Sequence, residues 1–231
     1  MTLRPAPLIE VDYTPENVLR SPGPWKALLW DMDGTLLDSQ VAILNRFVET
    51  FVHFGVEAPP INQLRYLIGP PIGNTLDTYL DVPVEESRAY YRSLSQRDGL
   101  RDQHLFPWIP ELLKTLHQAG YTMAVASSKT QAEVERICTT FGIDEFLDVI
   151  VGSSEDRPDK TLVVAEALRQ LGTHDALMIG DRWFDTEGAM ANGIPTVLVE
   201  WGYADKKEFS GAMASVATAE ELIDFLDNPT K

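Results

Sequence analysis

Two aspartates stand directly after an apolar run near the start of the chain, in the stretch LLWDMDGTLLDSQ. Asp31 and Asp33 are separated by one residue, and Gly34 and Thr35 follow them at once. A carboxylate at the end of a buried strand costs free energy unless a partner compensates its charge. The pattern therefore predicts a site in which these acids meet a cation and do chemistry.

Polar residues also follow three later segments of the chain. Ser127 and Ser128 end the run MAVASSK, Lys160 closes RPDK, and Asp181 and Asp185 follow the apolar part of LMIGDRWFD. Ligands of open parallel sheets bind beyond the carboxyl ends of the strands, which share one edge. If these runs are parallel strands of one sheet, four carboxylates, serine hydroxyls and a lysine converge on one crevice.

Such a cluster favours a magnesium site. Neighbouring carboxylates repel each other and raise their own pKa values unless a cation lies among them. Oxygen ligands without histidine or cysteine suit Mg²⁺, which also retains waters and substrate phosphate oxygens. The predicted cofactor is therefore Mg²⁺.

The same residue types fit phosphoryl transfer. A carboxylate beside Mg²⁺ and a phosphoryl group attacks phosphorus and becomes an aspartyl-phosphate. A second acid protonates the leaving oxygen and later takes a proton from the hydrolytic water. Lys160 lies in the first turn of a predicted helix, where the helix dipole disfavours a cation, so an anionic neighbour explains it better. Gly34 permits a tight turn beside the phosphate, and Ser127 would donate a hydrogen bond to it.

The elements that must position these residues are strands alternating with helices. From about residue 104 to the C-terminus, apolar runs alternate with amphipathic stretches, which predicts right-handed βαβ units. The predicted fold class is α/β, a doubly wound parallel sheet of the Rossmann-like kind. No strand is expected from residue 40 to residue 103, where helical spacing prevails.

Three regions follow from this pattern. Residues 1–24, broken by prolines, are expected to be an irregular extension, and residues 25–39 with 104–231 to form the α/β core. Residues 40–103 are expected to form a helical cap inserted in that core. Arg65 and Asn74, in the cap stretch LRYLIGPPIGNTL, are candidates for contact with the part of the substrate that is not phosphate.

Composition narrows the function classes. The 231 residues carry a formal net charge of −16, which disfavours non-specific binding to nucleic-acid polymers or membranes. No segment approaches the roughly 20 apolar residues of a membrane span. The single cysteine, Cys138, fits a reducing compartment, so we expect a cytoplasmic protein. The expected partner is a small phosphorylated metabolite, and the sequence does not specify an oligomeric state.

These motifs together carry a family resemblance. DMDGT resembles the first signature of the haloacid dehalogenase-like phosphohydrolase superfamily, and VASSK, the Lys160 segment and GDRWFD are similar to its next three in the same order. The resemblance extends from about residue 25 to the C-terminus. IGPPIGNTL and GDRWFDTEGAMANGI are similar to the phosphoglycolate phosphatase and 5′-nucleotidase-like branch, and the insertion resembles the family's helical C1-type cap.

The resemblance implies a role for each matching residue. Asp31 would be the nucleophile and Asp33 the general acid/base, and Asp31, the carbonyl of Asp33 and Asp181 would hold Mg²⁺, with Asp185 supporting through the metal's waters. The implied phosphate-binding residues are Ser127, Ser128, Lys160, Gly34 and Thr35. Many relatives have Lys-Pro at the third signature, whereas EDRPDK places Arg157 before the proline. Lys160 is the predicted phosphate lysine and Arg157 the alternative.

Other functions on this scaffold remain open at the level of sequence. A sugar-phosphate mutase would return the phosphate of phospho-Asp31 to a second hydroxyl instead of to water. A dehalogenase would have no use for Asp33 or for a Mg²⁺ site. A non-catalytic binding module would be favoured by loss of a catalytic residue, and none is lost here. The preferred prediction is a Mg²⁺-dependent phosphatase acting on a small monoester such as phosphoglycolate, a nucleoside 5′-monophosphate or a sugar phosphate.

Overall fold

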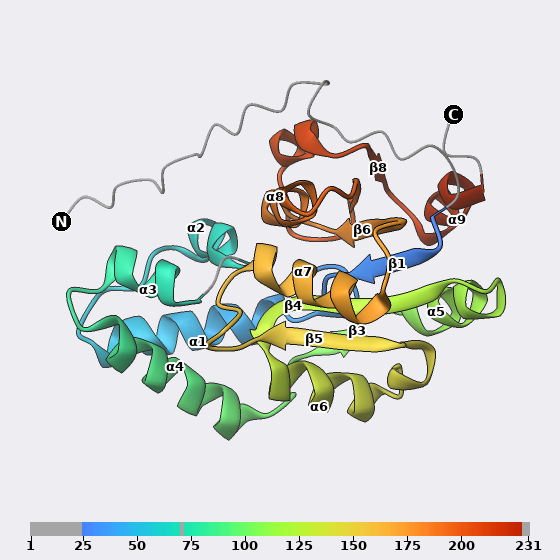
Figure 1. The fold of residues 1–231 in the computed structure, drawn as a ribbon. Coiled ribbons are helices and arrows are strands. Elements are labelled where there is room, and N and C mark those ends of the chain that lie inside the picture. Colours follow the sequence, from blue (N-terminus) through green and yellow to red (C-terminus); the bar gives the residue numbers. More distant parts are fainter. Residues whose placement is uncertain (1–24, 70–71, 228–231) are drawn as a thin grey trace.

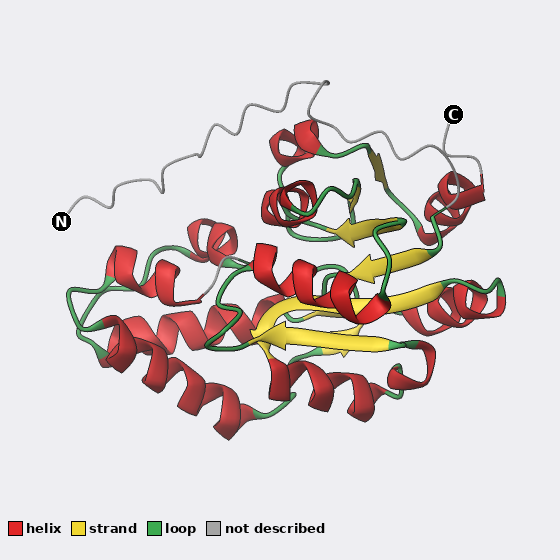
Figure 2. Cartoon of the chain, in the orientation of Figure 1, coloured by secondary structure: helices red, strands yellow, loops and turns green. Residues whose placement is uncertain are grey.

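The computed structural model describes residues 25–69 and 72–227, so the expected extension 1–24 lies outside the described residues. A central sheet carries helices on both faces, and a group of helices lies beyond one end of it (Figures 1 and 2). The sheet and its flanking elements are, in chain order, β1 (Ala27–Trp30), α5 (Ile109–Gln118), β4 (Thr122–Thr130), α6 (Gln131–Phe141), η2 (Asp144–Phe146), β5 (Val149–Ser153), α7 (Lys160–Leu171), β6 (Ala176–Gly180), α8 (Trp183–Ala191), β7 (Thr196–Val199), η3 (Lys206–Gly211), β8 (Ala214–Val216) and α9 (Ala219–Asp227). Inserted between β1 and α5 are β2 (Leu37–Asp38), α1 (Gln40–His53), α2 (Ile61–Leu64), η1 (Arg65–Leu67), α3 (Ile72–Tyr79), α4 (Val84–Asp98) and β3 (His104–Leu105).

The sheet has the strand order β5-β4-β1-β6-β7-β8, and every neighbouring pair is parallel. The predicted doubly wound parallel sheet is therefore confirmed. The central strand β1 pairs Trp30 with Val125 of β4 and with Ile179 of β6. All four residues of β1 are buried, as expected of a strand covered on both faces. Asp31 follows β1 and Asp181 follows β6, whereas Ser127 and Ser128 lie within β4, which continues to Thr130 instead of ending at them as the sequence predicted.

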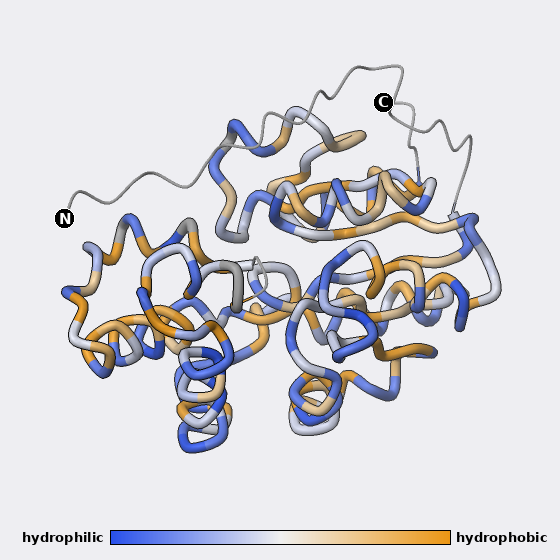
Figure 3. Tube along the Cα trace, turned by 60° about the vertical axis from the view of Figure 1, so that its left-hand side comes forward, coloured by the Kyte–Doolittle hydropathy of each residue, from blue (hydrophilic) through white to orange (hydrophobic). Residues whose placement is uncertain are grey.

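Alternate residues of β1 enter different cores. Leu28 and Trp30 belong to the hydrophobic cluster that also contains buried residues of α5, α6 and α9. Ala27 and Leu29 belong to the cluster under α7 and α8. The helices accordingly show alternating hydrophobic and hydrophilic stretches along the chain (Figure 3). Burial on both faces fixes the register of β1 and hence the position of Asp31.

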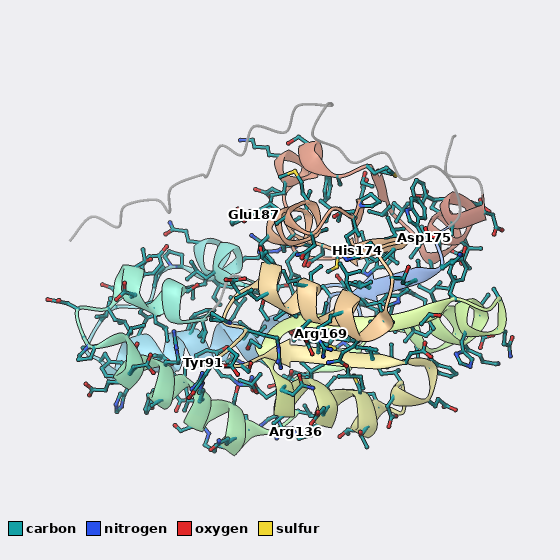
Figure 4. The ribbon with its side chains drawn as sticks, viewed as in Figure 1. Tyr91, Arg136, Arg169, His174, Asp175 and Glu187 are labelled. Carbon is teal, nitrogen blue, oxygen red and sulfur yellow. The ribbon has the colours of Figure 1, made fainter. Side chains whose placement is uncertain are left out.

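The inserted helices form a third hydrophobic cluster, which Tyr203 joins from the loop after β7. Phe47 and Phe51 of α1 pack there with Leu64, Leu76 and Tyr91. The Tyr91 ring, which Figure 4 labels on α4, lies 5.5 Å from the Phe47 ring between centroids. These helices occupy the segment for which the sequence predicts a cap.

Three short strands were not expected from the sequence. β2 and β3 form an antiparallel ladder that pairs Leu37 with Leu105 and joins the two chain segments connecting the inserted helices to the sheet. β8 has only three residues and adds to the sheet edge beside β7. Runs this short show no readable alternation, so only the tertiary contacts identify them. Within the described part of the chain, no helix combines the length and apolar character needed to cross a membrane.

Candidate active site

Asp31 lies at the centre of the crevice beyond the strands. Its backbone N–H donates to the carbonyl of Ile179 at 2.9 Å, which carries the ladder one residue past β1, and the residue is only 4 % exposed. The Lys160 ammonium donates to Asp31 Oδ1, and to the carbonyl of Ala126, next to Ser127, at 2.7 Å. Asp185 Oδ1 lies 2.7 Å from the same ammonium. Asp31 after β1, Ala126 within β4 and Asp185 beyond β6 therefore meet at one lysine.

Lys160 is placed by the start of α7. The carboxylate of Asp159 accepts a hydrogen bond from the Leu162 N–H at 2.9 Å and caps the helix, so that Lys160 is its first residue. Burial by itself lowers the pKa of Lys160, but the carboxylates of Asp185 and Asp31 outweigh it and raise that pKa above its ordinary value. The lysine is therefore a permanently charged group held between two acids.

Asp181 provides the observation that best fits a cation site. Its Oδ2 accepts from the Tyr203 N–H at 2.6 Å, whereas its Oδ1 is buried and has no hydrogen-bond partner among the described residues. Asp31, Asp181 and Asp185 each bring an oxygen within 4.8 Å of the others. Burial raises the pKa of Asp181 well above its ordinary value, and the two neighbouring carboxylates raise it further. One lysine cannot balance three buried acids, so a divalent cation fits this donor set.

Asp185 orients the loop that follows β6. Its Oδ2 accepts from the N–H groups of Asp181 and Arg182, at 3.1 and 3.0 Å. Gly180 leaves room for this carboxylate, because a Cβ there would lie 2.3 Å from Asp185 Oδ2. The Asp185 carboxylate therefore holds the backbone of Asp181 and Arg182 in place.

The charge of this cluster predicts a pH-dependent stability of the metal-free chain. Burial raises the pKa of Asp31 from 3.8 to about 7, against the opposing effect of Lys160. Between these values the folded protein keeps a proton that the unfolded chain releases, so the contribution of Asp31 to the free energy of unfolding falls as pH rises from about 4 to about 7. Asp31→Asn removes this titration. In denaturant unfolding with a chelator present, the free energy of unfolding of the variant should therefore rise relative to that of the wild type as pH increases from about 4 to about 7. Parallel curves of unfolding free energy against pH would contradict this expectation.

Asp33 has partners different from those of the other acids. Its Oδ1 accepts from the Ser39 hydroxyl and lies 2.9 Å from the Lys129 ammonium. Ser39 is the N-cap residue of α1, yet its hydroxyl makes no hydrogen bond to that helix and serves Asp33 instead. The Asp33 side chain is 15 % exposed, against 5 % for that of Asp31. A partly accessible carboxylate beside a buried one suits proton exchange with a bound molecule or water.

Gly34 allows the close approach of two segments. Its φ of +81° lies in the left-handed region, and a Cβ there would lie 2.1 Å from Asp181 Oδ2 and 2.9 Å from Tyr203 Cδ2. Gly34 therefore lies against the acid with the unpartnered oxygen. A side chain at this position would displace Asp181.

A pair of glycine variants separates backbone strain from this crowding. Gly55 has a similar φ of +72°, with nothing within 4 Å of its Cβ position. We expect Gly55→Ala to cost about 1 kcal/mol of unfolding free energy. Gly34→Ala should cost about 1–3 kcal/mol more, because overpacking adds to the strain. Gly34→Ala should also weaken binding of a divalent cation in calorimetry. Equal stability losses in the two variants, with unchanged metal binding, would contradict the assignment.

Three buried hydroxyls were predicted to bind phosphate. Ser127 is 1 % exposed, and its oxygen accepts from the Lys129 N–H at 3.2 Å, which leaves its own proton free to donate elsewhere. The Ser128 and Thr35 hydroxyls are buried, and neither has a hydrogen-bond partner among the described residues. Buried polar groups are normally satisfied, so unpaired hydroxyls close to the carboxylate cluster in sequence are consistent with a ligand that completes them.

The remaining predicted residues either make other contacts or have side chains that lie outside the described part of the structure. Arg157 donates to the carbonyl of Gly152 at 3.4 Å and is not among the groups that contact the acid cluster. Arg65 in η1 is exposed and donates to the carbonyl of Gly202 at 3.4 Å. Asn74 belongs to α3, but its side chain lies outside the described part of the structure.

Sequence reasoning missed three residues that position these acids. Lys129 pairs with Asp33, and the Tyr203 N–H binds Asp181 while its hydroxyl accepts from the Ser39 N–H at 2.8 Å. Lys129 directly follows the two serines, so its place at a strand end was a usable signal. Tyr203 and Ser39 are 164 residues apart, and no local pattern connects them.

The chain is similar to known proteins in both sequence and structure. A model of the haloacid dehalogenase-like hydrolase family matches residues 28–199. The chain is 37 % identical to the tyrosine-protein kinase PtkA of Mycobacterium tuberculosis, over 89 % of this chain and 73 % of that protein. It is 32 % identical to a 5′-nucleotidase of Pseudomonas aeruginosa, over 78 % and 85 %. The crystal structure of a predicted phosphatase from Clostridium acetobutylicum superposes with a TM-score of 0.82 at 30 % identity, covering 88 % of this chain and 99 % of that one.

Proposed function

Because the chain belongs to the haloacid dehalogenase-like hydrolases and to their phosphatases, we propose that it hydrolyses a small phosphate monoester through an aspartyl-phosphate on Asp31. The observation that carries this proposal is the convergence of Asp31, Asp185 and Lys160 beside Asp181, whose buried Oδ1 has no partner among the described residues. Thr35, which follows β1, and Ser127 and Ser128 of β4 would supply the hydroxyls for phosphate. Phosphatase-named relatives support the reaction class.

The chemistry assigns different tasks to the two acids of the first motif. Asp31 attacks phosphorus, so that a bond forms from its carboxylate oxygen and the bond to the leaving oxygen breaks. Asp33 gives a proton to that leaving oxygen. The Asp33 carboxylate formed in this step then takes a proton from a water molecule. That water attacks phosphorus and releases Asp31. The contacts of Asp33 with Ser39 and Lys129 support this division, because they give Asp33 partners different from the Lys160 that pairs with Asp31.

Asp31 and Asp181, with the main-chain carbonyl of Asp33, are the residues that would hold Mg²⁺, and Asp185 would support through water. When bound, Mg²⁺ neutralises phosphoryl oxygens and the buried carboxylates. Lys160 then holds Asp31 in place and stabilises the charge that develops on the phosphoryl group. Ser127, Ser128 and Thr35 donate to the remaining oxygens, with Gly34 allowing the backbone to approach.

The helices of residues 40–103 are proposed to act as a cap that excludes water and contacts the leaving group. Two polar bridges support this assignment on the core side. Tyr203 contacts both Asp181 and the Ser39 N–H at the entrance to α1. Arg65 reaches the carbonyl of Gly202 from η1. Arg65 and Asn74 remain the candidate contacts for the part of the substrate beyond phosphate.

The test is release of inorganic phosphate from a panel of monoesters, with and without Mg²⁺. The panel contains phosphoglycolate, nucleoside 5′-monophosphates and sugar phosphates, together with a sugar bisphosphate to detect mutase products. We expect Mg²⁺-dependent hydrolysis of at least one monoester, and the ranking names the substrate. Folded protein that binds Mg²⁺ and releases no phosphate from any of them would overturn the proposal.

A second candidate is favoured by one observation, the 37 % identity to a relative named as a tyrosine-protein kinase. In that case the acceptor of the phosphoryl group would be a tyrosine hydroxyl instead of water, and ATP would be the donor. Incubation with labelled ATP and a tyrosine-containing peptide separates the two functions. Phosphotyrosine as the product would favour the kinase, whereas free phosphate from monoesters without phosphotyrosine would favour the phosphatase.

A further inference from the structure

Arg182 is a buried cation that the proposed chemistry does not use. It lies between Asp181 and Asp185 in sequence, at the N-cap of α8, and is only 3 % exposed. A cation at a helix N-terminus opposes the helix dipole, and removing its charge from water costs more free energy still. Burial at this position therefore requires specific partners.

The partners of Arg182 come from two other parts of the chain. Its Nε donates to Glu208 Oε2 of η3 at 2.8 Å, and its Nη1 donates to the carbonyl of Ile68, directly after η1. The guanidinium carbon lies 5.7 Å from the Phe184 ring centre, within reach of a cation–π contact. Arg182 thus joins the loop of two proposed metal-site acids to the segment Arg65–Gly69 of the inserted helices.

The same segment makes two further contacts with the neighbourhood of Asp181. Gly69 faces Phe184 so closely that a Cβ there would lie 2.2 Å from the ring. Arg65 donates to the carbonyl of Gly202, where a Cβ would lie 2.4 Å from Asp181 Oδ2. Three contacts therefore tie this segment to the surroundings of Asp181. Two of them come from a guanidinium group, and the one made by Arg182 is buried whereas the one made by Arg65 is exposed.

We propose that Arg182 is a positioning residue that couples the placement of Arg65–Gly69 to the binding of Mg²⁺ at the acid cluster. The inference rests on the proposed metal site. Mg²⁺ fixes Asp181, and Arg182 in the same loop then holds the Ile68 carbonyl. Because such coupling is reciprocal, the segment that Mg²⁺ orders also favours Mg²⁺ binding.

A pure charge effect and a positioning role predict opposite changes in Mg²⁺ affinity when Arg182 is replaced. Removal of a cation beside Asp181 would tighten Mg²⁺ binding if its charge were all that mattered. A positioning residue has the reverse effect, so we expect Arg182→Gln to raise the Mg²⁺ dissociation constant by about fivefold or more. Arg182→Lys keeps the charge, loses the two-pronged geometry and should do the same.

The experiment uses the full chain, with calorimetric titration of Mg²⁺ and hydrogen exchange of the Arg65–Gly69 amides with and without the metal. In the wild type, Mg²⁺ should raise protection of this segment. In Arg182→Gln and Arg182→Lys that rise should disappear. Arg169→Gln is the control, because Arg169 lies on α7 (Figure 4), is 70 % exposed and pairs only with Glu166 among the described residues.

The possible outcomes distinguish failure of the coupling from failure of the proposed phosphatase reaction. Wild-type protection and affinity in either folded Arg182 variant would overturn the coupling and leave the phosphatase proposal standing. Tighter Mg²⁺ binding in Arg182→Gln would overturn it in favour of a pure charge effect. Wild-type protein that binds no Mg²⁺ would overturn both the coupling and the metal site, whatever the variants show.

Discussion

Asp31→Asn should abolish phosphate release, lowering turnover by roughly a thousandfold or more. The amide nitrogen and oxygen cannot attack phosphorus as the carboxylate does, and residual rate from the other groups of such a site is small. The fold should survive the change, because Asn has almost the same size and Lys160 keeps Asp185 as a charged partner at 2.7 Å. The measurement is steady-state turnover on whichever monoester the panel identifies.

Asp175→Asn provides the matched control. Asp175, labelled in Figure 4, has a half-exposed side chain 4.0 Å from the Lys26 ammonium and is not part of the acid cluster. It should retain wild-type turnover. If folded Asp31→Asn kept a tenth or more of the wild-type rate, Asp31 would not be the nucleophile.

Lys160→Met should destabilise the metal-free chain by about 3–5 kcal/mol at pH 8, because it leaves Asp31 and Asp185 buried without their counter-charge. The loss should shrink toward pH 5. Burial raises the pKa of Asp31 and Lys160 opposes that rise, so this pKa should rise further in the variant and protonation should relieve the repulsion. Turnover should fall about a hundredfold or more, since a charge-stabilising group is lost. Denaturant unfolding at both pH values and phosphate release check these expectations.

Arg157→Met distinguishes the two cations of the third motif. The Arg157 side chain donates a 3.4 Å hydrogen bond to the carbonyl of Gly152. Its replacement should change the free energy of unfolding by less than about 1 kcal/mol and leave turnover within a factor of a few. The reverse pattern, a silent Lys160→Met and an inactive Arg157→Met, would transfer the phosphate-binding role to Arg157.

The fold could be predicted from sequence where burial imposes a pattern. The apolar runs at β1, β4 and β6 are buried strands between amphipathic helices, so their order predicted a parallel sheet, and their ends located the acids. The family prediction is confirmed by the family model that matches residues 28–199. The ladder of β2 with β3, and strand β8, were missed because strands of two or three residues are too short to show a periodic pattern of apolar residues.

The site was less predictable where one residue depends on another far along the chain. Lys160 was expected to meet an anion, because a cation in the first turn of a helix is otherwise unfavourable, and its contacts with Asp31 and Asp185 agree with that argument. The contacts of Tyr203 with Asp181 and of Arg182 with Ile68 depend on how loops from the two ends of the sequence meet. No spacing rule describes such contacts.

The most direct test of the central claim is chemical trapping of the intermediate. Asp33→Asn should slow hydrolysis of the aspartyl-phosphate, while an aryl phosphate, whose leaving group needs no proton, still transfers its phosphoryl group to Asp31. Mixing the two with Mg²⁺, quenching rapidly and reducing with borohydride converts an aspartyl-phosphate to homoserine, which mass spectrometry locates. We predict homoserine at residue 31, and only after exposure to the phosphate ester. Phosphate release by the wild type with no homoserine at residue 31, or homoserine at another aspartate, would contradict the account.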